Sequence, residues 1–185
     1  HAVEQLHGAD HVGSGTGQPA LPGHPHTTQH PHPHAAAPSP RPDPADVVLR
    51  AVVTEDPLDV DEHARLVARS AAGAVVSFSG VVRDHDGGRG VQALDYSSHP
   101  SAGDVITRVA RQIATGHPDV LALAVSHRIG SLTIGDSALA CAVAAAHRTA
   151  AFAACAALVD EVKLQLPIWK RQEFADGTEQ WVNSP

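Results

Sequence analysis

The chain is poor in lysine, in aromatic residues and in sulfur. Among its 185 residues are no methionine, two cysteines, one tyrosine, three phenylalanines and two tryptophans. Cys141 and Cys155 lack the CxxC spacing of a zinc or redox site, so we expect both in the core of a reduced, cytoplasmic protein. No stretch approaches twenty uninterrupted apolar residues, and this excludes a membrane-spanning helix.

Several familiar site motifs are absent as well. The sequence has no GxxxxGK[ST] or GxGxxG phosphate loop, no HExxH and no paired CxxC. His85 and His99 lie in predicted loops and His127 near a predicted strand end, positions typical of surface or hydrogen-bonded histidines. We therefore expect neither a metal nor a cofactor.

Residues 1–46 are expected to form a disordered tail. They hold eight of the fourteen histidines, are rich in proline, glycine and alanine, and contain no aromatic residue. Such a segment buries too little apolar surface to offset the entropy of ordering it. Its imidazoles could bind a soft metal, but a flexible extension is the simpler interpretation.

Residues 47–185 are long enough for one domain with its own core. They carry 16 acidic and 12 basic residues, a formal charge of −4, which argues against a general nucleic-acid partner. Strands are expected over 47–53, 73–83, 91–97, 120–128, 137–146, 168–174 and 178–182, and helices over 59–69, 101–115 and 149–166. This order predicts an α+β fold in which helices pack on a mostly antiparallel sheet.

Local signals mark where these elements begin and end. Asp59 with Glu62, and Ser101 with Asp104, have the spacing of helix N-terminal caps. The dipeptide 176–177 is Asp-Gly, a strong hairpin signal. The glycine-rich segment 84–90 is expected to be a mobile loop.

The two lysines are the most informative residues of the chain. Lys163 and Lys170 lie seven residues apart, whereas eleven arginines supply the other basic groups. Unlike arginine, lysine can lose its proton and act as a base or nucleophile. Lys163 shares a predicted helical face with Ala156, Val159 and Leu166. Its amine is either partly desolvated there, which favours the neutral form, or kept in water at the end of its long chain.

Other basic residues recur where predicted elements end. Arg83 closes a strand, His147 and Arg148 precede a helix, and Arg171 follows Lys170. Strand ends and helix N-termini are places where cationic side chains and backbone NH groups can converge on an anion.

Four segments then point to a family. They are Gly73–His85, His127–Gly130 followed by Gly135–Asp136, Ala146–Phe152, and Lys163 with Pro167–Arg171. In this order they resemble the large, catalytic subunit of molybdopterin synthase, over residues 47–183 and not over the tail. One departure is Gln172, which stands where this family usually places an acidic residue.

The resemblance implies a sulfurtransferase of molybdenum cofactor biosynthesis. Such an enzyme converts cyclic pyranopterin monophosphate to molybdopterin by inserting two sulfurs as a dithiolene. The sulfur comes from the C-terminal Gly-Gly thiocarboxylate of a small ubiquitin-like subunit. Two large subunits pair, with one small subunit at each end of the dimer.

The resemblance also implies roles for individual residues. These are catalysis for Lys163 and Lys170, substrate binding for Arg83 and Arg171 together with His147 and Arg148 of the partner protomer, and a thiocarboxylate channel lined by Phe78 and Val159. Two alternatives stay open: a lysine-dependent lyase that forms a Schiff base, and a non-catalytic module that binds a ubiquitin-like partner.

Overall fold

The computed structural model describes residues 41–183. Most of the predicted tail, residues 1–40, lies outside the described residues. The last residues assigned to the tail form, together with Val47, a short helix, α1 (Pro44–Val47). Asp43 caps this helix, and its side chain accepts a hydrogen bond of 2.8 Å from the Ala45 amide. Pro44 occupies the first turn, where its missing N–H costs nothing. This helix therefore includes residues that the sequence assigned to the tail.

A four-stranded sheet forms the centre of the domain, in the order β1-β5-β7-β2. The strands are β1 (Val48–Thr54), β2 (Ala74–Val81), β5 (Val120–Arg128) and β7 (Ser137–Ala145). β1 and β5 run parallel, whereas the other two pairs are antiparallel. The predicted α+β fold with a mostly antiparallel sheet is confirmed.

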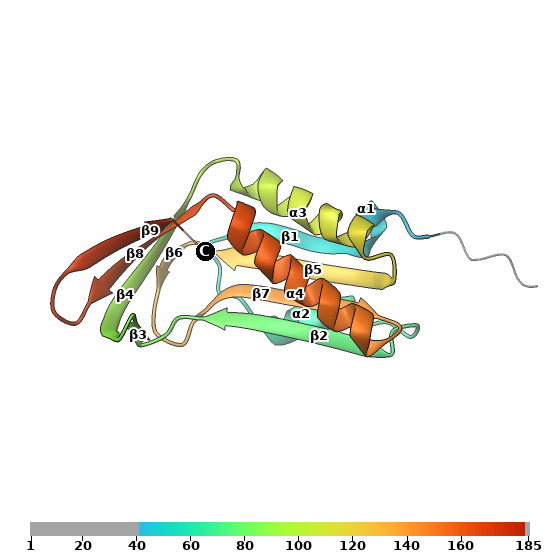
Figure 1. Cartoon of the computed structure of the whole chain (residues 1–185), viewed down its shortest axis with the longest axis horizontal. Coiled ribbons are helices and arrows are strands. Elements are labelled where there is room, and N and C mark those ends of the chain that lie inside the picture. The colour runs from blue at the N-terminus through green and yellow to red at the C-terminus, as the bar shows by residue number, and fades with distance from the viewer. Residues whose placement is uncertain (1–40, 184–185) are drawn as a thin grey trace, which may run out of the picture. The chain divides into compact units, whose positions relative to one another are not determined.

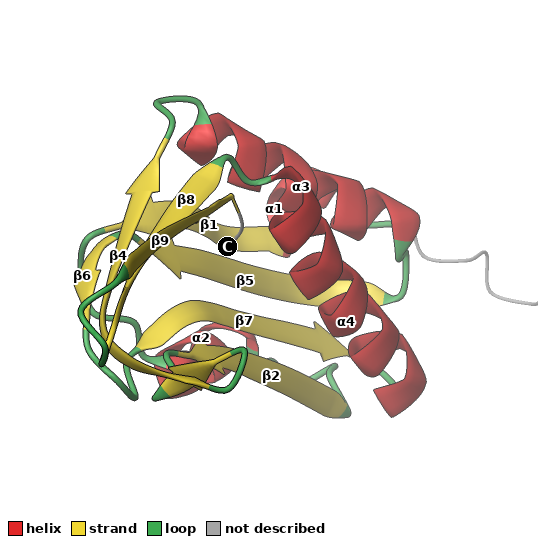
Figure 2. Cartoon of the chain, turned by 60° about the vertical axis from the view of Figure 1, so that its left-hand side comes forward, coloured by secondary structure: helices red, strands yellow, loops and turns green. Residues whose placement is uncertain are grey.

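Helices cover both faces of this sheet (Figures 1 and 2). α3 (Ala102–Gly116) and α4 (Arg148–Gln165) pack together on one face, and α2 (Val60–Val67) packs on the other. Alternation along the two central strands supplies both contacts. Leu123, Val125, Cys141 and Val143 join the core under α3 and α4, while Ala122, Ala124, Ala142 and Ala144 pack with Val67 of α2. Burial on both faces explains why β5 and β7 have near-continuous apolar sequences.

A second, antiparallel sheet lies beside the first, with the order β3-β4-β8-β9 (Figure 1). Its strands are β3 (His85–Asp86), β4 (Arg89–Ser98), β8 (Ile168–Phe174) and β9 (Glu179–Asn183), and β6 (Gly130–Leu132) pairs with β4. The β8–β9 hairpin closes at Gly177, whose φ of +83° suits glycine. The hairpin predicted at 176–177 is thus confirmed.

The structure corrects two local expectations. The segment 84–90 is a tight hairpin rather than an irregular loop, because Gly87 and Gly88, at φ +57° and +78°, form a two-residue turn between β3 and β4. Ser101 precedes α3 but makes no side-chain cap. Its hydroxyl bonds His99 Nδ1 at 2.8 Å instead. Asp59, by contrast, caps α2 through the amides of Asp61 and Glu62.

Both cysteines are buried and free, as predicted. Burial raises the pKa of the Cys155 thiol to about 11 and raises that of Cys141 further. Neither thiol is therefore ionised near neutral pH, and both act as small core residues. None of the helices described between residues 41 and 183 is long and apolar enough to cross a membrane.

Candidate active site

A cavity of about 250 Å³ lies where the two sheets meet. Its lining residues are Gly80, Val81, Arg83, Tyr96, His127, Ala138, Leu139, Lys163 and Lys170. They come from the ends of β2 and β5, the start of β7, the last turn of α4, and the strands β4 and β8 of the second sheet. The cavity thus collects residues that are far apart in the sequence, including both lysines.

The connection from α4 to β8 explains how both lysines reach this cavity. Leu166 leaves the helix with an extended backbone, φ −70° and ψ +120°, the conformation that a following proline favours. Pro167 then starts the turn into β8. Lys163 therefore faces the cavity from the last turn of the helix, and Lys170 faces it from a strand of the other sheet.

The two lysines differ in exposure. Lys163 is an exposed residue although it lines the cavity. The Lys170 side chain is only 21% exposed. Two interpretations of Lys163 were open. The structure favours the one in which the lysine side chain extends over apolar surface and its amine stays in contact with water.

Strand alternation separates Lys170 from its neighbour Arg171. Lys170 pairs across the sheet with Tyr96, which also lines the cavity. Arg171 pairs with Asp95 on the opposite face, where its guanidinium binds the carboxylates of Asp95 and Glu179. These two ion pairs raise the pKa of Arg171. The structure therefore does not bring Arg171 into the cavity, although the sequence predicted it to bind substrate.

The inner wall of the cavity is polar but neutral. His127 is 1% exposed, and its Nδ1–H donates to the carbonyl oxygen of Arg128 at 2.8 Å. Its ring packs edge-on against Tyr96, with ring centroids 5.1 Å apart. Burial, helped by the positive charge of Lys163, lowers the pKa of His127 to about 4. Burial also raises the pKa of Tyr96, so both side chains are uncharged at neutral pH.

A smaller hollow of about 70 Å³ adjoins the first and shares Arg83, Tyr96 and Lys170 with it. Asp86 of the β3 hairpin lines this hollow. Its carboxylate accepts a hydrogen bond of 2.7 Å from Gln172 Nε2 and lies 3.8 Å from Lys170 Nζ and 3.4 Å from Arg83 Nη2. The Gln172 bond and the two positive charges lower the pKa of Asp86.

His147 and Arg148 do not reach this cavity within the chain. They stand at the beginning of α4, and Arg148 precedes Lys163 by fifteen residues, which corresponds to about 22 Å along the helix axis. Both are exposed. His147 borders a different hollow of about 640 Å³, next to Pro118.

Phe78 and Val159 do not line the cavity but precede residues that do. Phe78 is partly buried on β2, two residues before Gly80, and packs against the core under α4. Val159 is 9% exposed and precedes Lys163 by one helical turn. Both are therefore close in sequence to residues of the cavity, Gly80 and Lys163, although neither lines the cavity itself.

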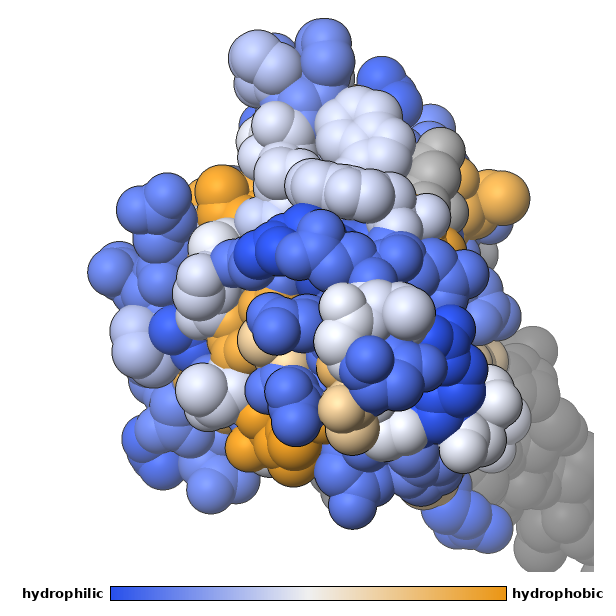
Figure 3. All heavy atoms as spheres, turned by 90° about the vertical axis from the view of Figure 1, so that its left-hand side faces the viewer, coloured by the Kyte–Doolittle hydropathy of each residue, from blue (hydrophilic) through white to orange (hydrophobic). Residues whose placement is uncertain are grey.

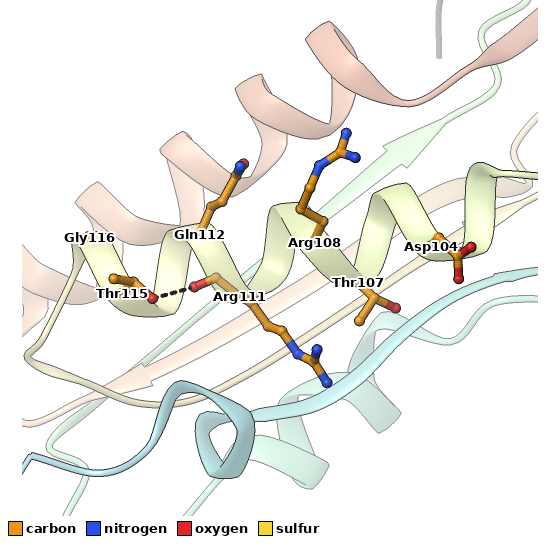
Figure 4. Close-up of a pocket in the computed structure, with 7 residues that line it drawn as sticks. All are labelled: Asp104, Thr107, Arg108, Arg111, Gln112, Thr115 and Gly116. Carbon is orange, nitrogen blue, oxygen red and sulfur yellow. Dashed lines mark hydrogen bonds between the residues drawn. The ribbon is translucent and has the colours of Figure 1, made fainter.

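Another hollow, of about 600 Å³, runs along α3 (Figure 4). Its described lining comes from this single helix. Arg108 and Gln112 point away on one side and Arg111 on the other (Figure 4). Because no groups from separate elements converge there, this surface is a weaker candidate than the cavity between the sheets.

Metal-binding groups do not cluster near the cavity. Within residues 41–183, no three His, Cys, Asp or Glu side chains are grouped so that they could hold a metal ion. The chemistry available at the site is therefore that of amines, a guanidinium, a phenol and a neutral imidazole.

Comparison with known proteins assigns the family. The family model described as "MoaE protein" matches residues 53–165. The chain belongs to this family. The molybdopterin synthase catalytic subunit of Nostoc sp. is 38% identical over 132 residues, which cover 71% of this chain and 80% of that protein. The resemblance stated from the sequence is confirmed.

Solved structures agree. The crystal structure of molybdopterin synthase from Staphylococcus aureus matches with a TM-score of 0.65 and 29% identity, over 72% of this chain and 96% of that one. A complex of subunits 1 and 2 of the molybdopterin-converting factor from Helicobacter pylori matches with a TM-score of 0.57 and 20% identity, over 74% and 90%. The second match shows the fold alone.

Family membership fixes the general function. MoaE proteins are catalytic subunits of molybdopterin synthase, sulfurtransferases of molybdenum cofactor biosynthesis. The cavity between the sheets holds three of the predicted site residues, Arg83, Lys163 and Lys170. Sequence reasoning missed Tyr96 and Asp86. The single tyrosine of the chain was a usable signal for the first, whereas nothing local indicated that Asp86 meets Lys170.

Proposed function

We propose that this chain transfers sulfur from the C-terminal thiocarboxylate of a small ubiquitin-like subunit to cyclic pyranopterin monophosphate and so forms the dithiolene of molybdopterin. The observation that carries the proposal is the convergence of Arg83, Lys163 and Lys170 on one cavity. Both reactants are anions, and a partly dry pocket with fixed cations stabilises anions and the charge that develops during acyl transfer. No cofactor is needed for this step.

The three cations have different capacities. The Arg83 guanidinium is a planar group with several N–H donors and suits the substrate phosphate. Lys163 and Lys170 can donate a proton, accept one when neutral, or form a transient covalent bond. His127 adds a neutral polar surface next to Lys163, since its low pKa keeps it unprotonated. The two lysines are therefore the proposed catalytic residues.

We infer the path of the sulfur donor from Phe78 and Val159. They lie on β2 and α4, one step from the Gly80 and Lys163 ends of the cavity. We place the C-terminal tail of the small subunit along this path, with its thiocarboxylate at Lys163. Membership of a family of synthase catalytic subunits supports a partner subunit of this kind.

A second copy of this chain would complete the site. His147 and Arg148 lie about 22 Å along α4 from Lys163 of the same chain, too far to share its cavity. Paired large subunits would bring them to the cavity of the other copy. The large apolar residue Phe152, 62% exposed on the first turns of α4 next to Arg148, is consistent with a helix face that the second copy covers. The complete assembly is then a heterotetramer.

A reconstituted reaction tests the proposed function. The chain would be mixed with a thiocarboxylated small subunit and cyclic pyranopterin monophosphate, and the dithiolene product measured. Product that requires both additions is the expected result. Complex formation without product would indicate a binding module, and an imine trapped by borohydride on a carbonyl substrate without any small subunit would indicate a lyase.

A further inference from the structure

The contacts of Asp86 form a small anion site. Its carboxylate meets an amide hydrogen of Gln172 at 2.7 Å, the Lys170 ammonium at 3.8 Å and the Arg83 guanidinium at 3.4 Å. Gln172 is 2% exposed, so its amide is a fixed donor inside the protein. Two positive charges and one buried N–H donor around one acceptor are the groups that recognise phosphate oxygens.

The donors and the acceptor come from different kinds of structure. Lys170 and Gln172 lie two residues apart on one face of β8, a central strand of the second sheet. Asp86, by contrast, stands at the tip of the β3 hairpin, beside the two-glycine turn, and its side chain is 34% exposed. The three donors are therefore built into or next to the sheet, whereas the carboxylate is delivered by a short surface hairpin.

We propose that Arg83, Lys170 and Gln172 form a phosphate-binding subsite, and that the Asp86 carboxylate occupies it as an internal substitute which an incoming phosphate group must displace. The identity of the phosphate compound as the pterin substrate rests on the proposed function. The subsite itself rests on the contacts of Asp86 with Arg83, Lys170 and Gln172. Gln172 and Asp86 are thus added to the residues that determine how an anionic substrate enters the cavity.

The amide of Gln172 is necessary for this exchange. An acidic residue, which the family usually has at this position, would place a second carboxylate against Asp86, so we infer the exchange only for the Asp86–Gln172 pair of this chain. The glutamine side chain instead donates its N–H to either anion without adding charge of its own. Arg83, Lys170 and Gln172 then bind the Asp86 carboxylate in the free protein and the phosphate group in the phosphate complex.

Inorganic phosphate is the probe for the test. Its affinity would be measured by calorimetric titration of the full chain at low ionic strength, without the small subunit. We expect Asp86→Asn to bind phosphate about five- to tenfold more tightly than the wild type, because a competing negative charge is removed from contact with two cations. Added salt should reduce this gain.

Asp84 provides the matched control. It lies on the same segment and carries the same charge, but its carboxylate contacts His85 rather than the three donors. Asp84→Asn should change phosphate affinity by less than about twofold, as expected for an exposed charge outside the site. In addition, Gln172→Met in the Asp86→Asn background should abolish the gain, since methionine keeps the volume but has no donor.

Two results would overturn the proposal. One is phosphate affinity in Asp86→Asn that equals or falls below that of the wild type, which would mean that Asp86 only orients Lys170. The other is an equal gain in Asp84→Asn. Phosphate binding is measured without turnover, so a gain without dithiolene product would reject the proposed function and keep the subsite. Dithiolene product without a gain in phosphate affinity would support the proposed function and reject the subsite.

Discussion

The two sheets of this domain are built for different tasks. In the first sheet, β5 and β7 are buried on both faces and consist mostly of alanine, valine and leucine. The second sheet carries ion pairs on its strands and hairpins, and the end of the molecule that it covers is mostly hydrophilic (Figure 3). One sheet provides a rigid core and the other provides charge. The reactive groups lie where the two sheets meet. Lys163 comes from α4, which packs on the first sheet, and Lys170 comes from β8 of the second sheet.

The largest expected effect distinguishes neighbours on one strand of the charged sheet. Lys170→Ala should lower kcat/KM in the reconstituted reaction by about 10²- to 10³-fold, because it removes a cation that faces the cavity. Arg171→Ala should lower it by less than about threefold, because Arg171 contacts Asp95 and Glu179 on the other face. Equal losses in both variants would show that the two faces do not differ in function.

The core sheet should instead respond in stability. Leu158 of α4 is fully buried against the first sheet, so Leu158→Ala should lower the free energy of unfolding by about 2–5 kcal/mol. Leu164 on the same helix is 78% exposed, and Leu164→Ala should change it by no more than about 0.5 kcal/mol. Urea denaturation measures both values. Similar costs at the two positions would contradict the packing described for α4.

The buried histidine between the sheets should make the protein sensitive to acid. His127 has its pKa lowered from 6.5 to about 4, so between these pH values the unfolded chain binds a proton that the folded protein does not. Stability is therefore unaffected above pH 6.5 and falls as the pH drops, by about 2–3 kcal/mol at pH 4.5.

Substitution isolates the contribution of His127 from that of the carboxylates. His127→Gln cannot titrate, so its free energy of unfolding should fall less than that of the wild type between pH 7 and pH 4.5. Urea midpoints at the two pH values give the comparison. If the variant and the wild type lose the same stability, the imidazole is protonated in the folded protein and the described environment is wrong.

The smallest expected effect compares two helix starts. Asp59 accepts hydrogen bonds from two amides of α2, so Asp59→Ala should lower the free energy of unfolding by about 1 kcal/mol. Ser101 makes no such bond to α3, and Ser101→Ala should cost at most about 0.5 kcal/mol. A larger cost at Ser101 would restore the cap predicted from the sequence.

Local patterns predicted most of the elements. The strand 120–128 agrees with the structure at both ends, and α4 begins and ends one residue before its predicted range. These segments have strong apolar runs bounded by glycine or proline, so local signals are sufficient. The exceptions also have local causes. The Gly87-Gly88 turn was an unused hairpin signal, and His99 competes for the hydroxyl that was expected to cap α3.

Long-range pairing was beyond the reach of the sequence. Nothing in the pattern indicated that the strands form two sheets, or that β1 and β5 run parallel. Lys163, Lys170 and Arg83 were predicted through their residue types and the family resemblance. Asp86 and Gln172 lie 86 residues apart and meet only because the β3 hairpin reaches β8. Arg171 lies on the opposite face of β8 from Lys170 because side chains alternate along a strand, and the sequence prediction did not apply this alternation.

The central claim is that an amine at the junction of the two sheets performs the sulfur transfer. The most direct measurement compares the wild type and Lys163→Ala in the reaction with thiocarboxylated small subunit and cyclic pyranopterin monophosphate. The account predicts that the variant folds, because Lys163 is an exposed residue, and still forms a complex with the small subunit through the rest of the interface, but forms less than about 1% of the dithiolene product. Wild-type turnover in Lys163→Ala would contradict it.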